Sequence, residues 1–293
     1  MEIVLITGAT GQLGSALVAS LSKDYQIIPT SSVDFDVADF NKTKEYILKK
    51  QPDVIIHSAA YTDVDGCENN PDKAFRVNGL GTRNVAVAAR QVKAKLFYIS
   101  TDYVFDGSKI GPYYEYDQPH PLNIYGKSKL FGEESVKEQL NQFFIIRTAW
   151  LYGKKGKNFV KTMLELARKK EKLKVVNDQR GTPTYTADLA KQVKELIPTD
   201  LYGTYHCTSQ GSCTWYEFAL EIFRLSGLDV KIEPVTSEEF SRAVKRPKNS
   251  VLENYMLKLQ GLYLMPHWKE SLKRFMGELN LQHELEAQME EAL

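Results

Sequence analysis

The first half of the chain alternates short apolar runs with longer amphipathic stretches. Apolar runs that predict strands occupy residues 2–6, 25–29, 54–58, 95–100 and 143–148. Between them, apolar residues recur at helical spacing and predict helices over residues 14–22, 42–50, 72–91 and 125–139. Because the strand-like runs are apolar on both faces, they fit a parallel sheet that helices cover on each side. The alternation predicts an α/β fold of the Rossmann type, doubly wound, with right-handed crossovers.

The second half is less regular and predicts a smaller lobe. Its helix-like stretches are residues 159–170, 186–197, 215–225 and the acidic tail 279–293, where apolar residues recur at amphipathic spacing. Its strand-like runs are residues 173–176, 204–207 and 231–234. No repeat or linker separates the halves. We therefore expect a dinucleotide-binding domain over residues 1–150, joined again by segments near 186–207, and an interleaved C-terminal substrate lobe over residues 151–293.

Composition argues against nucleic acids, membranes and zinc as partners of this protein. The 38 Lys and Arg residues balance 37 Asp and Glu residues, so nothing points to a nucleic acid. The first residues lack the basic start of an export signal, and no apolar run approaches the roughly 18 residues that span a membrane. Three scattered cysteines without a histidine cluster argue against zinc and for reduced thiols. These features predict a cytoplasmic protein with no membrane partner.

Three glycines follow the first predicted strand and open the first helix. Gly8, Gly11 and Gly14 are each three residues apart, and Thr10 lies between the first two. Glycine permits a tight turn and a close backbone approach to a pyrophosphate, which the free N–H groups of the helix start then bind. A glycine-rich turn without a ligand is the alternative. The strand before and the helix after favour dinucleotide binding.

The end of the second predicted strand bears on the choice of cofactor. An acidic residue there would bind the ribose 2′-hydroxyl of NAD, but this chain has Thr30, Ser31 and Ser32. Hydroxyl groups accommodate a 2′-phosphate, so the pattern favours NADPH and leaves NADH open. Asp36 is a candidate for the adenine side, with an ordinary turn or helix-cap aspartate as the alternative.

A tyrosine and a lysine at helical spacing are the candidate catalytic pair. Tyr125 and Lys129 are four residues apart and therefore share one helix face. A neighbouring ammonium would lower the pKa of the phenol, which could then exchange a proton with a carbonyl oxygen while a hydride moves. Thr101, just after a predicted strand, could hydrogen-bond the same oxygen. Asn78, within a predicted helix, could hold a water for proton relay.

These residues together resemble a known family. The three glycines, residues 58–60, Asn78, residues 100–102, and Tyr125 with Lys129 resemble the extended short-chain dehydrogenase/reductases. Within that superfamily the chain is similar to the dTDP-4-dehydrorhamnose reductase family. The stretches that carry this closer resemblance are residues 62–65, 100–107, 147–150, 158–163, 177–184, 214–216 and 246–250. The resemblance extends to about residue 280.

The resemblance implies reduction of the C4 ketone of dTDP-4-dehydro-L-rhamnose to dTDP-L-rhamnose with NADPH or NADH. It implies that Tyr125 donates the proton and that Lys129 supports it and the nicotinamide ribose. The implied cofactor contacts are Gly8, Thr10, Gly11, Gln12, Leu13, Asp36, Val37, Ala59, Ala60, Tyr61 and Thr62, with Tyr125 and Lys129. The implied contacts with the sugar nucleotide are Thr101, Asp102, Trp150, Arg246 and Asn249.

The chain departs from some relatives at a metal site. Some bacterial members form a dimer around Mg²⁺ held by glutamates, and the matching positions here are Ala16, Ala187 and Glu278. Alanine cannot ligate a metal, and one carboxylate is too little for an octahedral cation. We therefore expect no metal site, and a homodimer, if it forms, without a metal bridge.

Other interpretations of the sequence stay open. Trp215 and Trp268 are expected to be core or interface aromatics, and His57 a buried structural histidine. A different sugar-nucleotide ketoreductase or an epimerase of the same superfamily is one rival function. A reductase-like regulatory subunit without activity is another.

Overall fold

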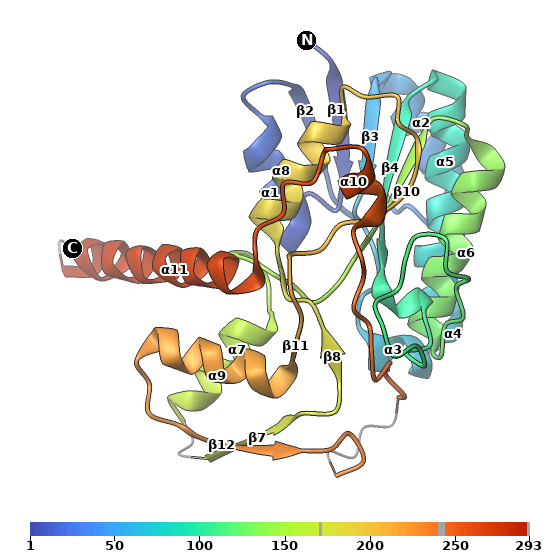
Figure 1. Ribbon diagram of the computed structural model, residues 1–293. Helices are drawn as coiled ribbons and strands as arrows, with labels where there is room; N and C mark the ends of the chain where they lie inside the picture. Colours follow the sequence, from blue (N-terminus) through green and yellow to red (C-terminus); the bar gives the residue numbers. More distant parts are fainter. Residues whose placement is uncertain (170–171, 240–243, 292–293) are drawn as a thin grey trace.

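A computed structural model describes residues 1–169, 172–239 and 244–291, with side chains described up to residue 279. Its central sheet has six parallel strands in the order β10-β5-β4-β3-β1-β2 (Figure 1). The strands are β1 (Ile3–Thr7), β2 (Gln26–Thr30), β3 (Val54–His57), β4 (Lys95–Thr101), β5 (Phe143–Thr148) and β10 (Gly203–His206). The predicted α/β fold with a doubly wound parallel sheet is confirmed.

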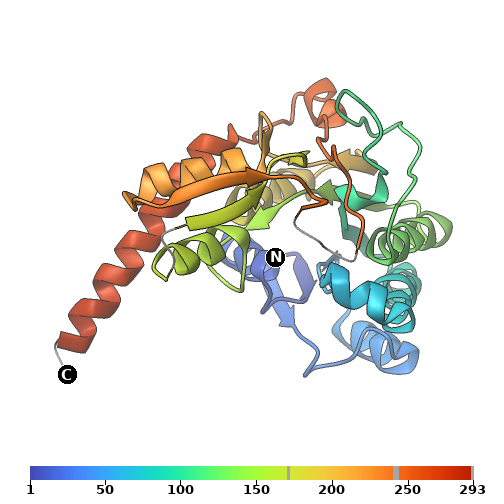
Figure 2. The same ribbon diagram turned by 90° about the horizontal axis from the view of Figure 1, so that it is seen from below.

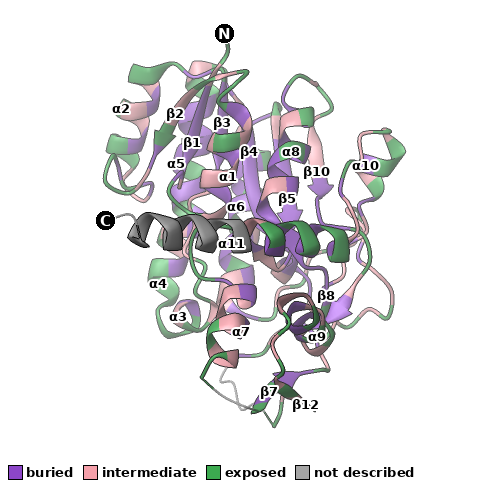
Figure 3. Ribbon diagram, turned by 90° about the vertical axis from the view of Figure 1, so that its left-hand side faces the viewer, coloured by how far each residue is buried: buried purple, intermediate pink, exposed green. Residues whose placement is uncertain are grey.

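Helices cover both faces of this sheet, which explains why its strands are apolar throughout. The helices α1 (Gln12–Leu21) and α8 (Thr186–Leu196) pack on one face, where Leu17 and Val193 are fully buried. The opposite face is covered by α2 (Phe40–Lys50), α5 (Gly81–Val92) and α6 (Ile124–Gln139). The inner strands β1, β3, β4 and β5 are accordingly almost entirely buried, whereas the edge strand β2 is partly exposed (Figure 3).

The strand order fixes where a ligand can bind. From β1 the chain crosses to β2 on one side, and β3 then lies on the other side of β1. Such a switch leaves a crevice at the carboxyl ends of the two strands, and open α/β sheets bind their ligands there. In Figure 1 these carboxyl ends face the second lobe.

The second lobe has its own apolar core, in which Phe218, Trp268 and Phe275 are buried. It contains α7 (Phe159–Ala167), α9 (Trp215–Ser226) and the parallel pair β7 (Lys172–Val176) and β12 (Lys231–Val235). Two-residue strands form the pairs β6 (Leu151–Tyr152) with β9 (Thr184–Tyr185), and β8 (Arg180–Gly181) with β11 (Cys213–Thr214). The expectation that Trp268 is a core aromatic is confirmed.

The last helices run along and away from the body. The short α10 (Tyr255–Leu259) packs beside β10, and α11 (Trp268–Glu291) extends beyond both lobes (Figure 2). The backbone is helical as predicted for the acidic tail, but the tail's side chains from residue 280 onward lie outside the described residues. Among the described residues, no helix is long and apolar enough to cross a membrane.

One predicted helix is irregular. The stretch expected as a single helix over residues 72–91 contains α4 (Pro71–Ala74), the π-helical turn η1 (Phe75–Leu80) and α5. It is preceded by the unpredicted α3 (Val64–Asn69). A π turn inserts one extra residue into a helix and is frequent at functional sites. Here it carries Asn78.

Candidate active site

The glycine loop packs directly against the end of β3. Gly8 has a φ of +67°, and a Cβ there would lie 2.8 Å from the backbone nitrogen of Ala59. A Cβ on Gly14 would lie 2.1 Å from the carbonyl oxygen of Gly8. Gly11 is the N-cap of α1 and supplies no side chain to bind the first N–H groups of that helix. The loop therefore leaves those groups available to an anion.

A cavity of about 300 Å³ lies beside this loop at the β1–β3 switch point. The predicted cofactor residues that it brings together are Gly8, Thr10, Gly11, Asp36, Val37, Ala59 and Ala60. Thr30, Ser31 and Ser32 also line it. Its shape and its helix N-terminus fit the adenosine and pyrophosphate of a dinucleotide.

Apart from Tyr125 and Lys129, four predicted cofactor residues do not line this cavity. The Leu13 side chain is buried in the core that α1 forms with the sheet. The Gln12 side chain accepts a hydrogen bond from Asn158 at 3.1 Å and faces a different cavity. Thr62 is exposed, and Tyr61 is half-buried under the Lys73 ammonium, 4.4 Å from its ring centre. Side-chain contacts from Gln12 and Leu13 to the adenosine end are thus excluded by their orientation.

The hydroxyl of Thr30 is already used. It is buried and donates to the carbonyl oxygen of Ile6 at 3.1 Å, so it cannot donate to a 2′-phosphate. The prediction that the Thr30 hydroxyl accommodates the 2′-phosphate of NADPH is therefore wrong. Ser32 is exposed on the same cavity wall and is better placed.

A 2′-phosphate also favours a nearby positive charge, and residues 30–32 carry none. Two cations from a distant segment lie close to the cofactor cavity. A cavity of about 350 Å³ shares Asp36 and Val77 with the cofactor cavity, and Lys73 and Arg76 line it. Sequence reasoning missed both residues because more than forty positions separate them from the β2 end. No local motif marks them.

Tyr125 and Lys129 lie on α6 close to the end of β4. Asn123 caps this helix by accepting from the backbone N–H of Gly126 at 2.9 Å, so Tyr125 is in the first turn. Lys129 is buried, and its ammonium donates to the carbonyl oxygen of Ile99 at 2.6 Å. The same ammonium lies 4.2 Å from the centre of the Tyr98 ring. Lys129 is therefore anchored to the end of β4.

The pKa of Tyr125 is shifted in the direction opposite to the one predicted from the sequence. Burial raises the pKa of Tyr125, and its hydrogen bond with Thr101 opposes that shift only in part. The prediction that Lys129 lowers this pKa is wrong, because burial and the nearby Asp102 carboxylate both raise the pKa of Tyr125. Burial also lowers the pKa of Lys129 to about 7, against the charge of Glu133. Tyr125 is thus a protonated phenol at neutral pH, which suits a proton donor.

The residues after β4 surround the Tyr125 hydroxyl. Thr101 ends β4 and donates to a carboxylate oxygen of Asp102 at 3.0 Å. Asp102 begins the 3₁₀ turn η2 (Asp102–Val104) and is almost fully buried. Burial raises the pKa of Asp102 to about 6. Hydrogen bonds with Ser250 and Thr101 oppose this shift of the Asp102 pKa only in part.

Asn78 is buried, and both its amide oxygen and its amide nitrogen are hydrogen-bonded to protein groups. Its Oδ1 accepts from the backbone N–H of Tyr61 at 2.7 Å, and its amide donates to the carbonyl oxygen of Tyr61 and to Ser128 at 3.0 Å each. It therefore ties the segment after β3 to α6. The water-relay role stays a prediction, and the contacts favour a role in positioning.

A larger cavity, of about 740 Å³, lies between the loop after η2 and the second lobe. Its wall contains Lys245, Arg246 and Lys248, three cations close together that suit a diphosphate. Arg246 also pairs with Asp65 at 3.4 Å. Only Arg246 was singled out from the sequence, although the run of basic residues at 245–248 was a visible signal.

The position of Asn249 differs from the expectation of a direct ligand contact. Its amide donates to the carbonyl oxygens of Lys109 and Gly111, at 2.7 and 2.9 Å. It does not line the cavity that contains Arg246. Asn249 holds the loop over residues 109–111, and its contact with substrate stays a prediction.

Trp150 follows β5 and is half-buried. Its ring is stacked on the ring of Trp215. Trp215, expected to be a core or interface aromatic, thus adjoins a predicted substrate residue.

The positions that correspond to the metal ligands of some relatives come together in space. Ala16, Ala187 and Glu278 line one cavity of about 410 Å³. Glu278 pairs there with Lys154 at 2.7 Å and accepts from the hydroxyl of Tyr185 at 2.8 Å. An ammonium thus neutralises the remaining carboxylate. Over the described part of the chain, no group of three His, Cys, Asp or Glu residues is arranged to hold a metal.

Comparison with known proteins extends this picture. The family model described as the RmlD substrate binding domain matches residues 1–281. A spore coat polysaccharide biosynthesis protein of Bacillus subtilis is 43% identical over 95% of this chain and 98% of its own length. A dTDP-4-dehydrorhamnose reductase of Streptomyces griseus is 40% identical over 92% of this chain and 91% of its own. A crystal structure of dTDP-4-dehydrorhamnose reductase from Bacillus anthracis in complex with NADP has a TM-score of 0.93 and 49% identity, covering 94% of this chain and 99% of that one.

Proposed function

Since this chain belongs to the RmlD substrate binding domain family, we propose that it reduces the C4 ketone of dTDP-4-dehydro-L-rhamnose to dTDP-L-rhamnose. The protein is an NAD(P)H-dependent oxidoreductase. The observation that carries the specific proposal is Tyr125, a protonated phenol in contact with Thr101 at the carboxyl edge of the sheet.

The cofactor cavity and the catalytic pair suit this reaction. NAD(P)H supplies the hydride that reaches C4 of the sugar. Tyr125 donates its proton to the ketone oxygen as that oxygen gains charge, and the Thr101 hydroxyl lies beside the same position. Lys129 donates to the carbonyl oxygen of Ile99 one helical turn from the phenol, and its ammonium binds the ribose of the nicotinamide nucleotide.

The substrate is held by groups from both lobes. Asp102 and Trp150 contact the sugar nucleotide, as the resemblance to the family implies. The cations of Lys245, Arg246 and Lys248 bind the diphosphate. In this arrangement residues 1–150 bind the cofactor, and residues 151–293 bind most of the substrate.

NADPH is the cofactor that this site favours, with NADH also used. The cavity wall at the β2 end has no carboxylate at Thr30, Ser31 or Ser32, and Arg76 adds positive charge nearby. We place the reaction in the cytoplasm, where thiols stay reduced.

The decisive test is an assay with freshly prepared dTDP-4-dehydro-L-rhamnose. The protein is mixed with this sugar nucleotide and NADPH or NADH, and cofactor oxidation is followed together with the product by mass spectrometry. One reduced cofactor consumed for each molecule of dTDP-L-rhamnose supports the proposal. Product formation without net oxidation would identify an epimerase, and no turnover with either cofactor would identify a non-catalytic subunit. Turnover only with a different 4-keto sugar nucleotide would reassign the substrate.

A further inference from the structure

The backbone of Trp150 adopts an unusual conformation. Its φ is +47°, in the left-handed region that residues other than glycine occupy at a cost. The residue follows β5 at the carboxyl edge of the sheet, where the predicted substrate contacts lie. Backbone strain of this kind persists only where surrounding groups determine the conformation. The neighbours of Trp150 therefore fix the direction of its indole.

Two contacts fix that indole. The rings of Trp150 and Trp215 are parallel within 4°, with ring centroids 3.4 Å apart. At a second point the ring meets the backbone of Gly181, where an added Cβ would lie 2.4 Å from Cε2 of Trp150. Only a residue without a side chain fits there. Trp150 is thus held against one aromatic face and one strand.

Trp215 is itself firmly placed, since it is the first residue of α9. Thr214 caps this helix in a reciprocal capping box with Glu217. The Thr214 hydroxyl also donates to Asn177 at 2.7 Å. A capping box satisfies the first N–H groups of a helix and fixes how the chain enters it. The ring of Trp215 therefore has little freedom to move away from Trp150.

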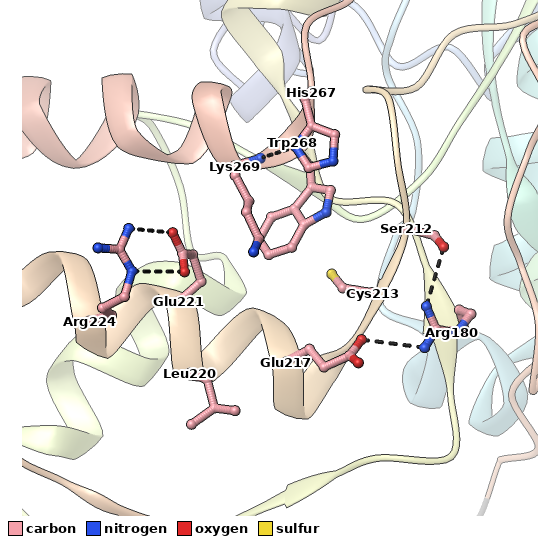
Figure 4. A pocket seen from close by; sticks show the side chains of 10 residues that line it. All are labelled: Arg180, Ser212, Cys213, Glu217, Leu220, Glu221, Arg224, His267, Trp268 and Lys269. Carbon is pink, nitrogen blue, oxygen red and sulfur yellow. Dashed lines mark hydrogen bonds and ion pairs between the residues drawn. The ribbon is translucent and has the colours of Figure 1, made fainter.

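The paired strands β8 and β11 connect Gly181 to the helix that carries Trp215. β8 and β11 pair through Gly181 and Cys213, which places Gly181 next to the start of α9. Arg180 reaches from β8 to Glu217 on α9, at 3.5 Å, and to Ser212 at 3.3 Å (Figure 4). The two contacts of Trp150, the Trp215 ring and the Gly181 backbone, are therefore parts of one rigid unit.

We propose that Trp215 is a positioning residue for substrate binding, because its ring holds the Trp150 indole in the orientation that meets the sugar nucleotide. This inference rests on the proposed function and goes beyond it. Trp215 acts through Trp150 and takes no part in the chemistry. The second lobe then contributes to the sugar site indirectly, because it fixes the orientation of the Trp150 side chain at the end of the central sheet.

The chain offers a clean test, because it contains three tryptophans, Trp150, Trp215 and Trp268. The near-ultraviolet circular dichroism of an indole depends on the aromatic ring stacked against it, and Trp268 takes no part in the stack. The variants are Trp215→Leu, Trp215→Phe and the control Trp268→Phe. Circular dichroism, thermal unfolding and steady-state kinetics are measured for each, with the sugar nucleotide and NADPH each varied while the other is saturating.

Loss of the stacked face is expected to raise KM for the sugar nucleotide by about tenfold in Trp215→Leu, from the typical strength of an aromatic pair. The KM for NADPH stays unchanged, because the cofactor cavity is lined by other residues. Trp215→Phe keeps an aromatic face and restores the sugar KM to within about threefold of the unaltered protein. Both Trp215 variants lose the near-ultraviolet signal of the Trp150–Trp215 stack, and Trp268→Phe keeps it.

Two results would overturn the inference. One is an unchanged sugar KM in Trp215→Leu. The other is a parallel loss of thermal stability and of both KM values that Trp215→Phe fails to rescue, since that marks a purely structural role. Failure of the proposed function is distinguishable, because the unaltered protein would then not reduce dTDP-4-dehydro-L-rhamnose.

Discussion

A buried ion pair beneath the catalytic residues should dominate the stability of this part of the fold. Glu133 lies one helical turn after Lys129 and has no exposed surface. Its carboxylate accepts two bonds from Arg147, at 2.9 and 2.7 Å, and one from Ser100 at 2.6 Å. Arg147 is on β5 and Ser100 on β4, so this pair joins α6 to the two strands that precede Thr101 and Trp150.

The expected magnitude follows from this burial. Removing one partner leaves an uncompensated charge in the core, which costs about 3–5 kcal/mol, whereas replacing both by apolar residues is often neutral. We therefore expect Glu133→Leu and Arg147→Met each to lower the free energy of unfolding by about 3–5 kcal/mol. The double variant should lose much less than the sum of the two.

The assay is urea unfolding followed by circular dichroism, with all four proteins in one double-mutant cycle. The surface pair of Arg224 and Glu221, in which the arginine side chain is 66% exposed, provides the matched control. Glu221→Gln should cost less than about 1 kcal/mol. Losses below about 1 kcal/mol in both buried single variants, or additive losses in the double variant, would refute the reasoning.

Four further outcomes are expected. Tyr125→Phe should lower kcat by about 10²–10⁴-fold with KM for NADPH unchanged, and near-normal turnover would refute its role as proton donor. Ser32→Asp should raise KM for NADPH at least about tenfold more than KM for NADH, because its carboxylate repels the 2′-phosphate; equal changes would place that phosphate elsewhere. Because the pKa of Lys129 is about 7, its ammonium is lost as pH rises, so kcat/KM should fall above about pH 7, and a flat profile to pH 9 would contradict this. EDTA should leave activity and molecular size unchanged, because Ala16 and Ala187 cannot bind Mg²⁺; a loss that Mg²⁺ restores would show a metal site.

The sheet could be predicted because its signal is local. Each of its first five strands was predicted from a local run of mainly apolar residues, and the glycine spacing after β1 predicts the dinucleotide-binding turn. The two-residue strands of the second lobe carry too few residues to form a pattern. The π turn at Asn78 was also hidden, because one extra residue does not disturb helical periodicity enough to be visible.

The details of the site depended on long-range packing. The four-residue spacing of Tyr125 and Lys129 predicts a shared helix face, but it does not reveal that the ammonium is anchored to Ile99. For the same reason the direction of the Tyr125 pKa shift was predicted wrongly. Arg76 near the cofactor cavity and Trp215 against Trp150 come from segments far apart in the sequence, so no spacing could identify them.

The way the chain passes between the lobes limits how such a protein can be divided. After β5 the chain enters the second lobe, but it returns to place α8 against α1 and β10 beside β5. A fragment that stops at Trp150 would expose Leu17 and leave the edge of β5 unpaired. Chimaeras that join the first half of one relative to the second half of another must therefore match a sheet edge and a helix interface as well as a substrate pocket. Exchange of specificity is more readily achieved by grafting the segments around β7 and α9 than by swapping halves.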